Sequence, residues 1–122
     1  KCRICAAENK LPATKKKVND AVDFIDSNYS RIDMSLNLVA DTIGVNASYL
    51  SNIFKKEKGC SLSKYLTQTR LEQAKKYLTE YPDKTLIEIA ESIGYSDVYY
   101  FSKNFKKYYG ISPSKYQEER KM

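Results

Sequence analysis

The sequence predicts an all-α protein of about seven helices, arranged as two helix-turn-helix subdomains joined by a long linker helix. Apolar residues recur at helical spacing along most of the 122 residues, and no segment alternates between apolar and polar residues for long enough to form a strand. The four Gly and three Pro are too few for a turn-rich β fold. A third observation, an internal repeat of two helices, divides the chain into two similar halves.

The first half of the sequence contains four helical patterns. The first has one apolar face, formed by Val18, Ala21, Val22, Ile25 and Tyr29. A shorter apolar face follows and is closed by Gly44; it comprises Leu36, Val39, Ala40 and Ile43. The third helix begins near Ala47 and ends at Gly59, with inward positions at Leu50, Ile53 and Phe54. Ser61 is the predicted N-cap of a long helix that ends near Tyr81, with buried positions at Leu62, Tyr65, Leu66, Leu71, Ala74 and Leu78.

The second half repeats part of this order. Thr85 and Glu88 have the spacing of a capping box, which predicts a helix N-terminus. The helix that follows is closed by Gly94 and has its apolar residues at Leu86, Ile89, Ala90 and Ile93. Asp97 is the predicted N-cap of the next helix, which ends at Gly110 and has inward positions at Phe101 and Phe105. Ser112 followed by Pro113 predicts the start of the last helix.

The two halves contain copies of one unit. Residues 35–44 match residues 85–94 at an offset of 50, and residues 54–65 match residues 105–116 at an offset of 51. In the second match, FKKEKGCSLSKY recurs as FKKYYGISPSKY, with eight of twelve positions identical. Each copy is a short helix, a turn that contains Gly44 or Gly94, and a second helix, which is the order of a helix-turn-helix. Ala40 and Ala90 allow the two helices to approach closely, and the glycines allow a turn with positive φ.

These patterns predict four segments. Residues 1–14 show no helical period and are interpreted as the remnant of a linker from an upstream region. Residues 15–60 form the first helix-turn-helix subdomain, residues 61–81 the linker helix, and residues 82–122 the second subdomain.

The outward faces of the third and sixth helices distinguish two interpretations of the repeat. A duplicated helical hairpin used only for packing would explain the hydrophobic spacing equally well. Opposite the apolar residues, however, lie hydrogen-bonding side chains flanked by Lys, namely Asn46, Ser48, Ser51, Asn52 and Lys55 in the first copy and Ser96, Tyr99, Ser102, Lys103 and Lys106 in the second. Such side chains fit the base edges and phosphates of DNA, and they favour a DNA-binding protein.

With these features, the sequence resembles the arabinose-operon regulator (AraC/XylS) family of bacterial transcription factors over roughly residues 18–118. The matching segments are SLNLVADTIGVNASYLSNIFKKEKGCSLSKYL, TRLEQAKKYL and TLIEIAESIGYSDVYYFSKNFKKYYGISPSKY. The second copy carries the denser pattern, IA-x₂-IGY-x₃-YYF-x₃-F-x₃-YG-x-SP-x₂-Y. The resemblance implies two recognition helices that enter successive major-groove segments on one face of the duplex, about 34 Å apart.

The resemblance also implies which residues contact DNA. The base-reading positions fall on Ser48, Ser51 and Asn52 in the first copy and on Val98, Tyr99, Ser102 and Lys103 in the second. Phosphate contacts are expected at Asn46, Lys55, Lys56, Ser96, Lys106 and Lys107, with one Lys of each adjacent pair binding. Because neither recognition helix carries Arg, the bidentate Arg–guanine contact is missing. Asn52 is expected to read adenine, Lys103 guanine, and Tyr99 and Val98 thymine methyl groups, which predicts an A·T-tolerant site with much indirect readout.

Several of these residue types have an ordinary structural role as an alternative. The Lys pairs also suit solvated helix C-termini, where cations favour the helix dipole. Tyr95, Tyr108 and Tyr116 are interpreted as core residues or as clamps of the helical hairpins, whereas Tyr49 and Tyr99 suit a DNA-facing position as well as a packed one. For Arg70, on the linker helix, we expect an internal salt bridge that orients the two halves rather than a base contact.

Charge and cysteine content limit the kind of partner and the cellular compartment that we expect. The net charge of +6 fits a polyanionic partner, but residues 18–54 carry one Arg against five Asp. Three Cys without a framework favour a reducing compartment, and we expect a cytoplasmic protein. No apolar run approaches the roughly 18 residues that span a membrane, so no membrane contact is expected. Cys2 and Cys5 have zinc-ligand spacing, but the chain has no His and only Cys60 besides, so no metal is expected.

The expected partner is therefore double-stranded DNA, and no catalytic residue or cofactor is expected. The chain lacks His, a Gly-rich phosphate loop and paired carboxylates in an apolar setting. The resemblance adds RNA polymerase and an upstream sensing or dimerisation domain as partners, and it leaves activation and repression open. The alternative is a helical protein-interaction module that has lost DNA affinity, which the weak positive charge of the first copy favours.

Overall fold

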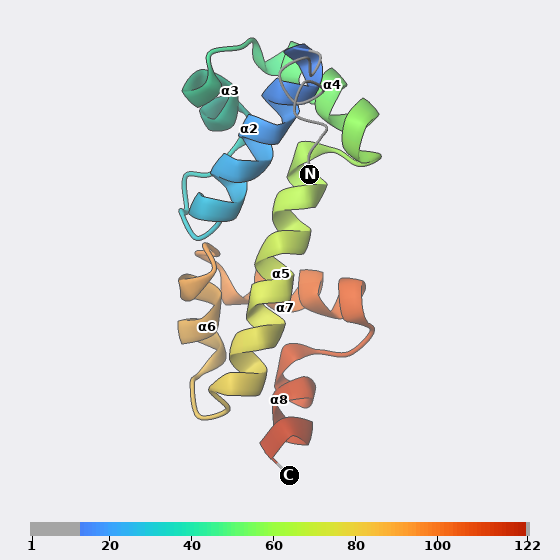
Figure 1. Ribbon diagram of the computed structural model, residues 1–122. Coiled ribbons are helices and arrows are strands. Elements are labelled where there is room, and N and C mark those ends of the chain that lie inside the picture. The colour runs from blue at the N-terminus through green and yellow to red at the C-terminus, as the bar shows by residue number, and fades with distance from the viewer. Residues whose placement is uncertain (1–12, 122) are drawn as a thin grey trace, which may run out of the picture. The chain divides into compact units, whose positions relative to one another are not determined.

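The computed structural model describes residues 13–121, and this part of the chain contains seven helices and no strand (Figure 1). The helices are α2 (Ala13–Asn28), α3 (Leu36–Ile43), α4 (Ala47–Lys58), α5 (Leu62–Glu80), α6 (Leu86–Ser92), α7 (Val98–Tyr109) and α8 (Pro113–Lys121). The predicted all-α class is confirmed. Most of the predicted linker remnant over residues 1–14, including Cys2 and Cys5, lies outside the described residues.

The described chain forms two compact units. The first contains residues 13–27 and 35–64, and the second contains residues 28–34 and 65–121. α5 contributes to both units, because its first three residues belong to the first unit and the rest to the second. Residues 28–34, which the sequence places in the first subdomain, pack with the second unit.

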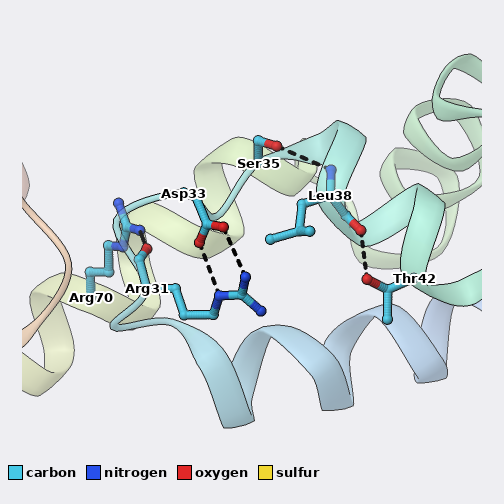
Figure 2. A network of polar contacts seen from close by, with 6 residues as sticks. All are labelled: Arg31, Asp33, Ser35, Leu38, Thr42 and Arg70. Atoms are coloured by element: carbon cyan, nitrogen blue, oxygen red, sulfur yellow. Dashed lines mark hydrogen bonds and ion pairs between the residues drawn. The ribbon is translucent and has the colours of Figure 1, made fainter.

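The first unit buries the apolar residues of α2, α3 and α4. Its buried side chains are Val18, Ala21, Ile25, Val39, Ala40, Leu50, Ile53, Phe54 and Leu62. α3 begins where the Ser35 hydroxyl accepts the N–H of Leu38 at 3.1 Å (Figure 2). The helix ends at Gly44, whose φ is 79°. Capping at both ends therefore limits α3 to eight residues and sends the chain back toward α4.

The second unit is built around the C-terminal part of α5. Its core comprises Leu71, Ala74, Leu78, Ile89, Ala90, Ile93, Tyr95, Phe101, Phe105 and Tyr116. The predicted capping box is present, because the Thr85 hydroxyl accepts the Glu88 N–H at 3.1 Å while Oε1 of Glu88 accepts the Thr85 N–H at 2.9 Å. Pro113 begins α8, as the Ser112-Pro113 pair predicts, and the Ser112 hydroxyl accepts the Lys115 N–H at 3.2 Å.

Three expectations about single residues are wrong. Tyr29 is not the last apolar residue of the first helix, because α2 ends at Asn28 and Tyr29 packs against the second core. Tyr108 is not a core residue, because it is 42% exposed, although its ring packs on that of Tyr109 with centroids 4.7 Å apart. Arg70 binds backbone carbonyl oxygens rather than the carboxylate of a salt bridge, since it donates to the oxygens of Tyr29 and Arg31 at 2.8 Å and 2.7 Å.

Candidate nucleic-acid interface

The two helix-turn-helix units share a turn hydrogen bond and a glycine with positive φ, although the C-cap is Gly44 for α3 and Ile93, not Gly94, for α6. The Val45 N–H donates to the Ala40 carbonyl at 2.9 Å, and fifty residues later the Tyr95 N–H donates to the Ala90 carbonyl at 2.9 Å. Gly44 and Gly94 have φ angles of 79° and 98°, which are the positive values predicted for both turns. The sequence repeat is therefore also a structural repeat, in which α3 leads into α4 and α6 leads into α7.

α4 presents a polar face that starts at its N-cap. The Asn46 side chain accepts the N–H of Tyr49 at 3.1 Å, so its amide is already engaged in capping. The helix turns Leu50, Ile53 and Phe54 into the core, and this fixes which residues face away from it. On that outward face, Ser48, Asn52, Lys55 and Lys56 are exposed and Ser51 is half-buried.

α7 presents a more aromatic face. The Asp97 carboxylate caps the helix by accepting the N–H groups of Tyr99 at 2.9 Å and Tyr100 at 3.4 Å. Phe101 and Phe105 are fully buried, with ring centroids 5.9 Å apart. The outward residues Ser96, Tyr99, Lys103, Lys106 and Lys107 are exposed, and Ser102 is half-buried.

Two predicted base-reading residues of α7 differ in how freely they could contact a ligand. The Tyr99 side chain is 84% exposed, the largest exposed fraction among the large hydrophobic side chains described. Val98, directly before it, is half-buried and packs against the second core. Val98 therefore offers only part of its surface to a thymine methyl group, whereas Tyr99 offers most of its ring.

A cleft of about 270 Å³ lies between α6 and the start of α7. It brings together three of the predicted contact residues, Ser96, Val98 and Tyr99, and its wall also includes the acidic residues Glu91 and Asp97. Two carboxylates beside the cleft disfavour a phosphate at this place. Neutral groups such as a thymine methyl are better suited to it.

The predicted phosphate-binding lysines lie at the C-terminal ends of the recognition helices. Lys55 and Lys56 lie in the last turn of α4, and Lys106 and Lys107 lie in the last turn of α7. These positions favour cations through the helix dipole alone, so their placement fits both a structural and a phosphate-binding role. All four side chains are exposed and free to meet a partner.

The structure adds two exposed residues to this surface that the sequence did not single out. Tyr100 is 57% exposed, and its ring lies 5.9 Å from that of Tyr95. Ile87 on α6 is 56% exposed and lines the cleft beside Tyr99. Helical spacing could have placed both outside, because Tyr100 directly precedes the inward Phe101 and Ile87 falls off the apolar face formed by Leu86, Ile89, Ala90 and Ile93.

The described residues contain neither a metal-ligand cluster nor a membrane-spanning helix. No group of three or more Cys, Asp and Glu residues within 13–121 lies close enough to hold a metal ion. None of the helices of this part is both long and apolar enough to cross a membrane.

Comparison with known proteins identifies the family of this repeated unit. Residues 39–119 match the family model described as a helix-turn-helix domain, which is more than half of the chain. The chain belongs to the AraC-type helix-turn-helix family. The predicted family resemblance is thereby confirmed.

Individual relatives of this AraC-type domain are regulators. The chain is 38% identical over 112 residues to the msm operon regulatory protein of Streptococcus mutans, covering 92% of this chain and 40% of that protein. It is 40% identical over 109 residues to the lactose operon transcription activator of Staphylococcus xylosus, covering 88% and 38%. The C-terminal domain of AraT, a response regulator from Geobacillus stearothermophilus, superimposes with a TM-score of 0.82 at 38% identity, with 85% of each chain covered.

These comparisons establish the kind of domain. The chain is a DNA-binding domain of the kind found in transcription regulators. It spans about two fifths of the length of the operon regulators that it matches.

Proposed function

We propose that this domain reads a specific double-stranded DNA sequence by placing α4 and α7 in major-groove segments. The observation that carries the proposal is the repeated turn, which gives each unit a second helix with its apolar side buried and its polar side exposed. A helix of this width fits the major groove of B-DNA. We expect the two helices to contact successive major-groove segments on one face of the duplex.

The proposed base contacts follow from side-chain chemistry. Asn52 has the donor and acceptor that pair with adenine N7 and N6, and Lys103 can donate to guanine O6 and N7. Ser48, Ser51 and Ser102 accept or donate to either kind of base edge. Tyr99 lies beside the cleft and would contact a thymine methyl, with Val98 contributing its exposed part.

The proposed backbone contacts come from both charged and neutral groups. Lys55, Lys56, Lys106 and Lys107 would neutralise phosphates, whereas Asn46 would donate a hydrogen bond without removing charge. Ser96 would do the same only from the rim of the cleft, because Glu91 and Asp97 in its wall disfavour a phosphate inside it. Only the lysines therefore release counterions when DNA binds. Because one or both members of each pair can bind, two to four phosphates would be neutralised.

A salt titration of fluorescent duplex tests this proposal. The logarithm of the association constant should fall linearly with the logarithm of salt concentration, with a slope between about −1.8 and −3.6 at about 0.9 per phosphate. Lys106→Gln should reduce the magnitude of the slope by about 1, whereas Lys76→Gln, which alters another exposed lysine, on α5, should leave it unchanged. Binding that does not respond to salt would contradict DNA recognition and favour a helical protein-interaction module.

The full-length protein is proposed to act on transcription. The Staphylococcus xylosus relative is named as a transcription activator, and we propose the same direction of control here. Activation would require contact with RNA polymerase, and response to a signal would require a sensing or dimerisation region elsewhere in the protein. A reconstituted transcription assay with and without the full-length protein tests this proposal, and transcript levels should rise on templates that carry the selected site.

A further inference from the structure

Arg70 is the buried charged side chain of the second unit. Its relative exposure is 9%, and it projects from α5 toward two other chain segments. Nε donates to the Tyr29 carbonyl at 2.8 Å and Nη2 donates to the Arg31 carbonyl at 2.7 Å, both in the 28–34 segment (Figure 2 shows Arg70 beside Arg31). The guanidinium also lies 5.4 Å from the ring centroid of Tyr95, in the turn between α6 and α7. One side chain thus joins three parts of the chain.

Gly94 supports this junction from the other side. A Cβ atom at Gly94 would lie 2.9 Å from Nη2 of Arg70 and 2.9 Å from the Tyr29 carbonyl oxygen. At Gly44, the equivalent glycine of the first copy, an added Cβ would meet no atom within 4 Å. Both glycines have positive φ, but only the second turn requires glycine to leave room for Arg70.

Tyr95 connects this junction to the recognition helix. Its ring lies 5.7 Å from the ring of Phe101 and 5.9 Å from that of Tyr100, both on α7. Tyr95 is also buried, so its ring has little freedom to move independently of these neighbours. A shift of the Arg70 side chain would therefore reach the first turns of α7 through Tyr95.

We propose that Arg70 is a positioning residue for DNA binding, which holds the 28–34 segment against the turn before α7 and so sets the placement of Val98 and Tyr99. The planar guanidinium places two donors in fixed directions and one face on an aromatic ring, which a flexible ammonium cannot reproduce. The inference rests on the proposed function, because it requires α7 to read DNA.

The test measures sequence preference separately for the two recognition helices. Duplexes bound by the unaltered chain are selected from a random pool, and the bases read by α4 and α7 are assigned with Asn52→Ala and Lys103→Ala. Arg70→Lys keeps the charge, so attraction to phosphates is unchanged. We expect Arg70→Lys to weaken binding of the selected duplex about tenfold, as loss of a base contact does, and to relax the preference only at the α7 bases.

A matched pair of turn variants supplies the control. Asn tolerates a left-handed conformation, so Gly44→Asn introduces a side chain at modest backbone cost, whereas the Cβ added by Gly94→Asn meets both the Arg70 guanidinium and the Tyr29 carbonyl oxygen at 2.9 Å. Only Gly94→Asn displaces the Arg70 guanidinium, and it should reproduce the Arg70→Lys result while Gly44→Asn keeps the original preference. Combining Arg70→Lys with Gly94→Asn should add little to either change alone, because both act on one junction.

The outcomes distinguish positioning from a purely structural role. All variants are compared at a temperature where far-ultraviolet circular dichroism shows them fully folded. The inference would be overturned if a folded Arg70→Lys variant kept its preference at the bases read by α7. It would also be overturned if the variant lost as much preference at the bases read by α4 as at those read by α7. Either result would leave the proposed function intact. If the unaltered chain selects no sequence at all, the proposed function and this inference both fail.

Discussion

Asn52 and Lys103 lie on exposed faces of the recognition helices in the two copies, but they carry different chemistry. Asn52 is a neutral side chain with one donor and one acceptor group, suited to reading a base edge without altering charge. Lys103 is a cation that can serve either a base or a phosphate. The first unit is therefore expected to contribute selectivity, and the second more of the affinity.

Replacing either residue by Ala should reveal base reading. We expect Asn52→Ala and Lys103→Ala each to cost on the order of 1–3 kcal/mol of binding free energy on the preferred duplex and to relax its sequence preference. Fluorescence anisotropy with the preferred and singly altered duplexes measures both effects. Asn19→Ala on α2 and Lys76→Ala on α5, also exposed, serve as controls. Wild-type preference in both test variants would show that these contacts are assigned wrongly.

At the scale of elements, each helix of the repeated unit begins at a side chain that binds its first-turn N–H groups. Ser35, Asn46, Thr85 and Asp97 perform this role for α3, α4, α6 and α7. α6 has only seven residues, so its N-terminal capping matters more than it would in a long helix. The Glu88 carboxylate adds the second half of the capping box there.

The capping box should give α6 a pH-dependent stability. Hydrogen bonds from the Thr85 backbone N–H and hydroxyl hold the pKa of the Glu88 carboxyl below its ordinary value of 4.5. The unfolded chain therefore binds this proton more readily, so the stabilisation is present above pH 4.5 and is lost as pH falls through the folded pKa. We expect Glu88→Gln to lower the melting temperature near neutrality and to have a smaller effect in acid. Melting curves by circular dichroism at several pH values measure this.

A charge-matched variant provides the control for that experiment. Glu91→Gln also removes one exposed carboxylate from α6, but Glu91 lies at the other end of the helix. If the melting temperature of Glu88→Gln depends on pH in the same way as that of Glu91→Gln, the capping box is not the cause of the pH-dependent stability.

At the scale of the whole molecule, the second helices of the two repeated units, α4 and α7, pack on separate cores. The chain passes from one unit to the other after residues 27, 34 and 64, although the sequence repeat suggests a single passage through the linker helix. Phe54 is fully buried in the first unit, and Phe105 is fully buried in the second at the corresponding place of the repeat. Each unit therefore depends on its own aromatic anchor.

Truncating one anchor should affect its own unit most. We expect Phe105→Ala to lower the free energy of unfolding by about 3–5 kcal/mol, because it leaves a cavity where a ring was fully buried. Hydrogen exchange should then show faster exchange of amides in α6 and α7 than in α3 and α4. Phe54→Ala should reverse this order. Equal loss of protection across all four helices in both variants would contradict independent cores.

Much of this protein was determined by the sequence alone, because the deciding signals are local. Caps, helix-ending glycines and inward-facing residues follow from spacings of three to four residues, and Thr85 with Glu88 or Phe101 with Phe105 were placed correctly on that basis. The offset between the copies likewise identified the two helix-turn-helix units and their exposed faces. Which groups of DNA α4 and α7 contact stays a prediction, because the position of a bound duplex is not fixed by local sequence patterns in this chain.

Contacts between residues far apart in the sequence depend on how the helices pack. Arg70 and Tyr29, whose carbonyl it binds, are 41 positions apart. The helical periodicity around each residue does not indicate that the two meet. The same holds for the half-buried state of Val98, the exposure of Tyr108 and the cleft beside Tyr99, which depend on how α6, α7 and α8 pack. Helical spacing fixes which side of a helix faces inward, but the residues that cover that side are set by packing across the whole unit.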